Sequence, residues 1–291
     1  MRRSMLFLPG NTPNIIINGE ILGADAVILD LEDAVSPTEK DSARILVRNS
    51  IRLMGFGPRE VIVRVNGLDT PYWKEDLQAV IPAGVQTVML PKSATAEDIR
   101  LCDAFMAETE LANGIPEGTV RLMPLIETAL GVENAYLIAS ACPRVTAIFL
   151  GGEDLTADLR CKRTKGGEEI RYARQRLVCA ARAAGVDVYD TPFTDVNDDE
   201  GIRADALTAK SFGFTGKASI SPRHVAAINE VFSPSLKEIE YALAVMDAIR
   251  QAKAQGRGAV ALNGKMIDAP VVARAERTLA DAEALGLGRE A

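Results

Sequence analysis

The sequence predicts an α/β fold, a (β/α)8 TIM barrel with a C-terminal helical extension. Short apolar or β-branched runs recur eight times, and segments with helical spacing lie between most of them. Continuous apolar strands separated by helices are typical of parallel strands that are buried on both faces. Eight such units match the repeat of this barrel, and no linker rich in Pro, Gly or Ser divides them.

The eight strands are expected, in chain order, at 4–9, 25–33, 61–66, 86–92, 120–127, 145–154, 186–193 and 216–222. The clearest helix lies at 168–185, where apolar residues share one face and Gly185 ends the pattern. A doubly wound open sheet is the competing fold. It would usually bring a Gly-rich phosphate loop after an early strand, and "LPGNTPN" at 8–14 is too weak a match.

The barrel is therefore assigned to residues 1–233 and the helical extension to residues 234–291. The extension contains a helical stretch at 234–255, a Gly-rich stretch at 254–264 and a last helix that starts near Pro270. This tail exceeds what a barrel requires. We expect it to carry a lid-like segment that folds over a barrel mouth.

Composition excludes several classes of function. The net charge of −7 and the pI near 5.0 argue against a nucleic acid or an anionic membrane as the main partner. No apolar stretch approaches the roughly 20 residues of a transmembrane helix, and the N-terminal apolar run is too short for a signal peptide. The four cysteines form no CxxC pair, so neither disulfides nor a zinc site is implied. A cytoplasmic protein is expected.

Polar side chains follow the expected strands repeatedly. In a barrel these positions converge on the face that holds active sites. Because a strand-end Asp often caps the next helix, a structural role remains open for Asp30, Glu153 and Asp190 taken singly. The whole set comprises Asp30, Glu32, Asp33, Arg64, Asn66, Lys92, Glu127, Glu153, Asp154 and Asp190.

Carboxylates crowded around a barrel mouth repel each other unless a cation is present. Arg64 and Lys92 supply part of the compensation, and Mg²⁺ would supply the rest with only one or two protein carboxylates. The only histidine, His224, cannot make a zinc triad or a Ser-His-Asp site, and we expect it on the surface or as a helix cap. A Schiff base on Lys92 is the rival chemistry, although acidic neighbours favour a charged lysine.

Several motifs in order resemble one family, the citrate-lyase-like and malyl-CoA-lyase-like aldolases, and within it the citrate lyase beta subunits. The resemblance runs from end to end, with one departure: related sequences commonly have His or Asn where this chain has Ser221. The motifs are "RRSMLFLPG" (2–10), "DAVILDLEDAV" (25–35), "IVRVNGLD" (62–69), "MLPK" (89–92), "LIET" (125–128), "LGGEDL" (150–155), "DTPFTDVNDDEG" (190–201), "GFTGKASISPRHVAAINEVFSPS" (213–235) and "LNGKMIDAPVVARA" (262–275).

The resemblance implies a Mg²⁺-dependent lyase that splits a carbon–carbon bond in an acyl thioester and releases an oxo acid and an acetyl thioester. It also implies roles for individual residues. Glu127 and Asp154 match the metal ligands, Arg64 matches the residue that contacts substrate, and Asp268 matches a catalytic acid/base. We expect Arg64 and Glu127 to bind substrate together with Asp30, Asn66 and Lys92.

The implied substrate is a citryl thioester on CoA or an acyl carrier protein. A citrate lyase beta subunit would work with acyl-transferase and carrier-protein subunits and in a homo-oligomer, a trimer or hexamer, whose neighbouring tail delivers Asp268. A stand-alone lyase for malyl-CoA, methylmalyl-CoA or citramalyl-CoA is the second hypothesis, and a non-catalytic structural subunit is the third. For Asp268 itself, an ordinary helix N-cap before Pro270 is the alternative.

Overall fold

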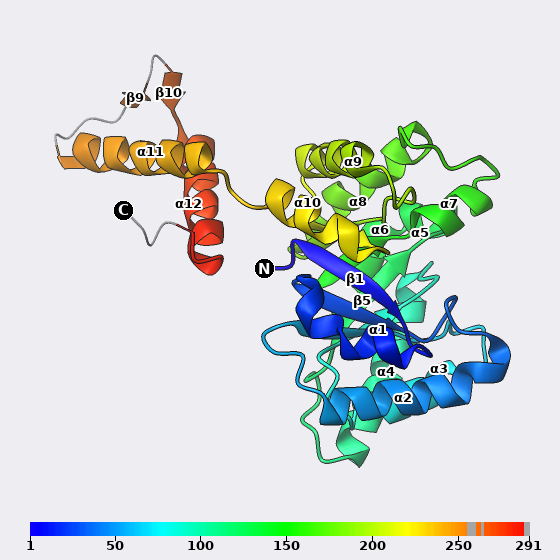
Figure 1. Cartoon of the computed structure of the whole chain (residues 1–291). Coiled ribbons are helices and arrows are strands. Elements are labelled where there is room, and N and C mark those ends of the chain that lie inside the picture. Colours follow the sequence, from blue (N-terminus) through cyan, green and yellow to red (C-terminus); the bar gives the residue numbers. More distant parts are fainter. Residues whose placement is uncertain (255–259, 263–264, 288–291) are drawn as a thin grey trace. The chain divides into compact units, whose positions relative to one another are not determined.

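Eight parallel strands close into a barrel in the computed structural model, which describes residues 1–254, 260–262 and 265–287 (Figure 1). The strands follow one another in chain order, and β8 pairs back onto β1 through Ala218 and Met5. The predicted (β/α)8 fold is confirmed. The strands are β1 (Ser4–Pro9), β2 (Ala26–Asp30), β3 (Glu60–Arg64), β4 (Thr87–Leu90), β5 (Arg121–Ile126), β6 (Ala147–Leu150), β7 (Asp187–Asp190) and β8 (Gly216–Ser219).

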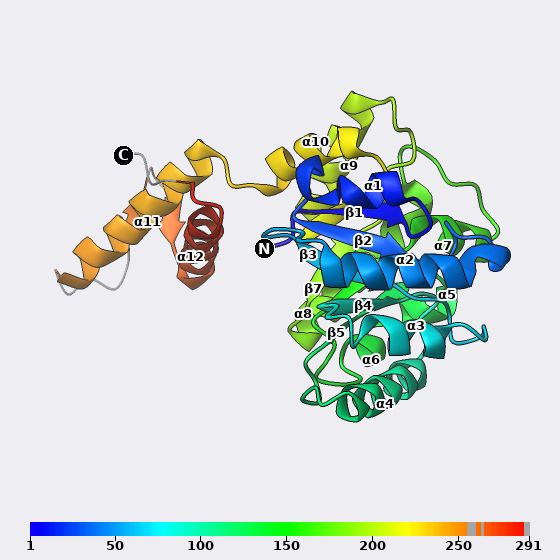
Figure 2. The same cartoon turned by 60° about the horizontal axis from the view of Figure 1, so that its bottom comes forward.

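Helices lie between successive strands and surround the barrel (Figure 2). The predicted helix at 168–185 is confirmed as η3 and α8, and Gly185 ends it in the left-handed conformation at φ 73°. The helices are α1 (Pro13–Ile17), η1 (Gly19–Leu22), η2 (Pro37–Glu39), α2 (Lys40–Leu53), α3 (Trp73–Val80), α4 (Ala96–Ala112), α5 (Ala129–Glu133), α6 (Ala135–Ala139), α7 (Gly152–Asp158), η3 (Glu168–Ile170), α8 (Arg171–Ala184), α9 (Asp199–Phe212) and α10 (Pro222–Phe232).

The expected strands are longer than most of the observed ones, mainly at their carboxyl ends. The expected run 145–154 is the largest difference, because β6 ends at Leu150. Glu153 and Asp154 follow in the first turn of α7 and not at a strand end. Asp30, Arg64 and Asp190 are the last residues of their strands, whereas the other polar residues lie in the loops and helix starts that follow.

Side chains alternate along each strand, so every second residue points into the barrel. The barrel interior is apolar, and the residues that fill it are Met5, Ala26, Ile28, Ile62, Met89, Met123, Leu125, Ala147, Phe149, Tyr189 and Ala218, with Phe7 packed against them. Asp30, Arg64 and Glu127 continue the same phase at the carboxyl ends. Asp190 and Lys217 have the opposite phase and are buried outside the barrel interior, where Asp190 pairs with Arg174 of α8.

The remaining residues, 230–291 with Met1, form a second compact unit, whereas the expected boundary was residue 233. Its helices α11 (Leu236–Ala254) and α12 (Ala269–Ala284) pack through Ala242, Val245 and Ala275. Its strands β9 (Val260–Leu262) and β10 (Lys265–Ile267) pair antiparallel. Residues 255–259 and 263–264 of the expected Gly-rich stretch lie outside the described residues. None of the helices in the described part of the chain is long and apolar enough to cross a bilayer.

Closure of the barrel depends on Gly216 in β8. A Cβ at Gly216 would lie 2.2 Å from the Arg2 carbonyl oxygen and 2.7 Å from that of Arg3, so Gly216→Ala would push β8 away from the start of β1. We expect this substitution to cost about 1–3 kcal/mol of unfolding free energy, measured by urea denaturation. Gly55→Ala is the matched control, because a Cβ there meets nothing within 4 Å. Equal midpoints for the two variants would contradict the prediction.

Candidate active site at the carboxyl end of the barrel

A cavity of about 450 Å³ opens at the carboxyl ends of the strands. One part of its wall is apolar and is formed by Phe7, Pro9, Ala34, Leu125, Phe149, Pro192 and Ile220. The other part is polar or formed by glycine, and comprises Asp30, Asp33, Arg64, Glu127, Gly151, Gly152, Glu153, Asp154 and Thr191. A mainly apolar cavity with a few convergent charged groups is the usual form of a small-molecule site.

Arg64, the last residue of β3, lies between the carboxylates of Asp30, at the end of β2, and Glu32, in the loop that follows. Its Nε and Nη2 donate to Asp30 at 2.7 and 2.6 Å, and its Nη1 lies 2.9 Å from Glu32 Oε2. The guanidinium carbon is 5.2 Å from the ring centroid of Phe7. Burial alone would lower the pKa of Arg64, but the charge of Asp30 and its hydrogen bonds, with Glu32 and Asp33, raise it. The guanidinium is therefore a fixed positive charge at the cavity wall.

Asp30 also organises the loop that follows β2. Its carboxylate accepts the backbone N–H groups of Glu32 at 2.9 Å and Ala34 at 3.2 Å. The structural role left open for Asp30 is thus observed, together with its grip on Arg64. Glu32 received no role from the sequence, yet its buried carboxylate touches both Arg64 and Lys92. Burial raises the pKa of Glu32 to about 7 against the charge of Arg64. The available signal was spacing: Glu32 follows Ile28 and Asp30 at every second residue, which is the alternation of side chains that point into the barrel.

Glu127 follows β5 and is only 2% exposed. Its Oε1 accepts the backbone N–H of Lys92 at 2.7 Å, and no ion pair of Glu127 occurs among the described residues. Burial, followed by the charges of Glu32 and Asp154, raises the pKa of Glu127 to about 9. The Glu127 carboxyl is thus a buried acid held by one backbone hydrogen bond, without an ion pair in the described part of the chain.

Asp154 lies in the first turn of α7 and lines the same cavity. Its charge reaches Glu127, and Gly151 lies directly against Glu127, because a Cβ at Gly151 would be 2.6 Å from Glu127 Oε2. Within the part of the chain that the structure describes, no three His, Cys, Asp or Glu side chains gather into a metal cage. Two carboxylates are nevertheless the protein share that Mg²⁺ commonly takes, with water and substrate as its other ligands.

Two residues expected to bind substrate do not line the cavity. The Asn66 side-chain amide donates to Asp76 Oδ2 at 2.6 Å in a buried pair. Lys92 is 46% exposed at its side chain, and its Nζ lies 3.3 Å from Glu32 Oε1. Burial lowers the pKa of Lys92, but the charge and hydrogen bond of Glu32, together with the charges of Asp33 and Glu127, raise it overall. A Schiff base requires an unprotonated amine, so this environment does not favour the lysine-dependent chemistry.

The expectation of a surface or capping position for His224 is wrong. His224 lies on α10 and is fully buried, with its ring centroid 6.1 Å from that of Phe193. Burial lowers its pKa, so a neutral imidazole is favoured. A helix places every third or fourth residue on its inner face, and this residue falls on that face.

Asp268 belongs to the second compact unit. It is the N-cap of α12, and its carboxylate accepts the backbone N–H of Val271 at 3.1 Å. The capping alternative is thus observed, and an additional catalytic role stays a prediction. Ser221 lies in the turn after β8, where its N–H donates to Ser219 Oγ at 3.1 Å.

Comparisons with known proteins agree with this architecture. The family described as HpcH/HpaI aldolase/citrate lyase matches residues 3–222. The citrate lyase subunit beta of Leuconostoc mesenteroides subsp. cremoris is 44% identical, over 96% of this chain and 92% of that protein. An L-malyl-CoA/beta-methylmalyl-CoA lyase of Cereibacter sphaeroides is 35% identical, over 97% of this chain and 94% of that protein.

Among solved structures, the chain is similar to that of the protein CitE from Mycobacterium tuberculosis in complex with magnesium, acetoacetate and coenzyme A. It is 30% identical and superposes with a TM-score of 0.79, over 97% of this chain and 98% of that one. The likeness covers both the barrel and the C-terminal extension in sequence.

The raised pKa of Glu127 predicts a pH dependence of stability. Because this pKa rises from 4.5 to about 9 on folding, the folded chain binds the proton more tightly, and the contribution of Glu127 to stability falls as pH rises between these values. We expect the melting temperature of the metal-free protein to fall more steeply over this window than that of Glu127→Gln. Thermal melts in a chelator test this. Glu117→Gln, in an exposed loop, is the control and should keep the parent slope.

Proposed function

The chain belongs to the HpcH/HpaI aldolase/citrate lyase family, and from this premise we propose that it cleaves a citryl thioester to oxaloacetate and an acetyl thioester, as the beta subunit of citrate lyase. The observation that carries the proposal is a single barrel-mouth cavity lined by the charged Arg64 and the carboxylates of Glu127 and Asp154. The 44% identity to a citrate lyase subunit beta over nearly the whole chain supports it.

Glu127 and Asp154 would hold Mg²⁺. The two groups provide only oxygen ligands, and burial together with the charges of Glu32 and Asp154 raises the pKa of Glu127. The magnesium in the CitE complex supports the proposal that this chain uses Mg²⁺. When bound, the ion would polarise the oxygen that becomes the ketone of oxaloacetate.

Arg64 has the properties that the cleavage requires. In a retro-aldol cleavage the substrate hydroxyl gives its proton to a base, such as a water molecule, and becomes the ketone, the adjacent carbon–carbon bond breaks, and the electron pair passes into the enolate of the acetyl thioester. The fixed guanidinium of Arg64 would stabilise the enolate oxygen. The enolate carbon then takes a proton to become the acetyl methyl group. Asp268 would supply this proton from the tail of a neighbouring subunit.

The acyl carrier would be an acyl carrier protein or CoA, because both present the same pantetheine arm. A separate acyl-transferase subunit and a homo-oligomer, trimer or hexamer, complete the proposal. The C. sphaeroides relative favours a second candidate, a stand-alone lyase for malyl-CoA, methylmalyl-CoA or citramalyl-CoA. The metal site and the chemistry would be the same, and only the acyl group would differ.

The deciding experiment assays the purified chain with citryl-CoA, malyl-CoA and citramalyl-CoA side by side, with Mg²⁺ and with excess chelator. We expect the highest kcat/KM with citryl-CoA and loss of activity in chelator. A strong preference for malyl-CoA or citramalyl-CoA would favour the second candidate. Absence of cleavage with all three would reject both.

Arg64→Lys tests the role of the guanidinium. The substitution keeps the charge but loses the planar fork that grips Asp30 and aims at the substrate, so kcat should fall at least about tenfold. Lys74→Arg, at an exposed lysine of α3, is the matched control and should leave steady-state kinetics unchanged. If only KM changes in Arg64→Lys, Arg64 binds substrate and does not stabilise the enolate.

Asp268 can be tested by complementation between subunits. Arg64→Ala and Asp268→Asn should each be inactive alone. When equal amounts are unfolded together and reassembled, some sites would combine an intact barrel with an intact tail, and random assembly would restore about a quarter of the parent activity. A mixed sample no more active than either variant, despite demonstrated subunit exchange, would show that Asp268 does not act across subunits.

A further inference from the structure

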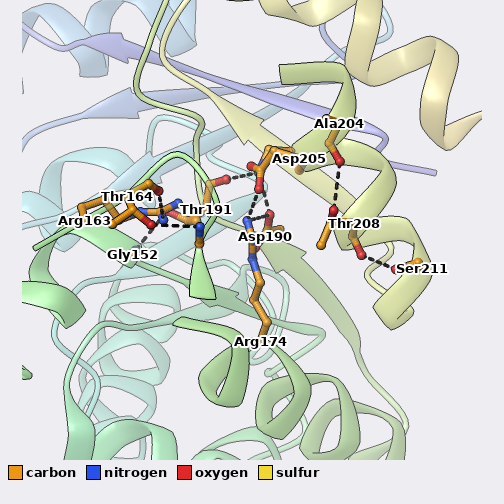
Figure 3. Close-up of polar contacts among 12 residues, drawn as sticks. Gly152, Arg163, Thr164, Arg174, Asp190, Thr191, Ala204, Asp205, Thr208 and Ser211 are labelled. Carbon is orange, nitrogen blue, oxygen red and sulfur yellow. Dashed lines mark hydrogen bonds and ion pairs between the residues drawn. The ribbon is translucent and has the colours of Figure 1, made fainter. Parts of the chain in front are cut away.

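Thr191, the residue after β7, forms a hydrogen bond with the first residue of α7. Its Oγ1 accepts the backbone N–H of Gly152 at 3.0 Å, as Figure 3 shows. The first amides of a helix have no partner within that helix, and the N-cap residue of α7, Gly151, has no side chain to supply one. A hydroxyl from the next strand thus caps a helix that belongs to another part of the sequence.

The start of α7 fits closely between two cavity side chains. A Cβ at Gly152 would lie 2.8 Å from Thr191 Oγ1 and 3.0 Å from its Cγ2. On the other side, a Cβ at Gly151 would lie 2.6 Å from Glu127 Oε2. The chain reaches Asp154 two residues later. The backbone just before Asp154 is therefore enclosed by Glu127 on one side and Thr191 on the other.

Thr191 is itself anchored from behind by charges that the proposed mechanism does not use. Lys217 of β8 is 0% exposed, and its Nζ donates to the Thr191 carbonyl oxygen at 2.6 Å. The same ammonium lies 2.6 Å from Asp190 Oδ2 and 2.6 Å from Asp205 Oδ2. Arg174 binds Asp190 through two hydrogen bonds of 2.9 Å and reaches Asp205 at 2.7 Å (Figure 3).

These four buried side chains carry two positive and two negative charges. Removing one partner from such a cluster leaves an unpaired buried charge, so its members hold one another in place. The Lys217 ammonium also donates a hydrogen bond to the carbonyl oxygen of Thr191. The peptide that carries the capping hydroxyl is thus fixed by β7, β8, α8 and α9 together.

We propose that Thr191 is a positioning residue for the metal site: through Gly152 it sets Asp154 against Glu127. The inference rests on the proposed Mg²⁺ site and adds a residue that does not itself bind the ion. Misplacement of a ligand by a fraction of an ångström is enough to weaken a site that depends on only two carboxylates.

The first test needs no metal and no substrate. Amide hydrogen exchange at the start of α7 is compared in Thr191→Val, which keeps the shape but loses the acceptor, and in Thr191→Ser, which keeps the acceptor. We expect Thr191→Val to speed exchange of the Gly152 amide at least about fivefold and Thr191→Ser to stay within about twofold. Thr146→Val is the matched control, because Thr146 Oγ1 is a buried hydroxyl without a hydrogen-bond partner among the described residues.

The second test titrates Mg²⁺ alone into the same full-length proteins by calorimetry. Thr191→Val should bind Mg²⁺ about tenfold more weakly and lose kcat with little change in KM, whereas Thr191→Ser and Thr146→Val should match the parent. Unchanged exchange and unchanged Mg²⁺ affinity in Thr191→Val would overturn the inference. If the parent itself fails to bind Mg²⁺, the proposed function fails, and the exchange data still decide whether Thr191 caps α7.

A double-mutant cycle keeps the inference testable if Thr191→Val proves unstable. Gly152→Ala should weaken Mg²⁺ binding because the new Cβ meets Thr191. Thr191→Ala removes the two nearest atoms that it would meet, Oγ1 and Cγ2, so the double variant should bind Mg²⁺ more tightly than the sum of the two single effects implies. Strict additivity would show that the two positions act independently and would overturn the inference.

Discussion

The alternation of side chains around a closed parallel barrel is the constraint on which the rest of this structure depends. With eight strands of one direction, every second residue must point inward, and the carboxyl ends must converge on one mouth. Apolar residues therefore fill the interior, and Asp30, Arg64 and Glu127, in the same phase, meet above it. Residues of the other phase, such as Asp190 and Lys217, must instead find partners among the helices.

The charged residues at the barrel mouth differ in how well their charges are paired. Arg64 is held in ion pairs with Asp30 at the end of β2 and Glu32 in the loop that follows. Glu127 is left with one backbone hydrogen bond and the nearby charge of Asp154. Two carboxylates placed in this way repel each other, and a divalent cation between them would relieve the repulsion. The same repulsion would lower the stability of the metal-free protein and favour the proposed metal binding.

The two carboxylates assigned to the metal come from elements of different rigidity. Glu127 directly follows β5, which is paired with β4 on one side and β6 on the other. Asp154 belongs to α7, a helix of seven residues. A short helix has little stability of its own, and its position depends on tertiary contacts. The glycine pair at 151–152 permits close contact on both sides, and the buried ion cluster behind Thr191 makes one of those sides rigid.

The sequence by itself determined the barrel, its eight strands and most of the polar residues that line the mouth, because apolar runs, helical spacing and strand-end polarity are local patterns. The sequence placed Asp30 and Asp190 in one set, whereas in the structure Asp30 lines the cavity and Asp190 is buried against Arg174. Only the tertiary structure decided which of these side chains share one cavity, why Asn66 turns to Asp76, and why His224 is buried. Those outcomes depend on the path of the backbone after each strand ends and on partners distant in the chain, such as Lys217 for Thr191. A local pattern contains no information about such partners, since they meet only when the barrel closes.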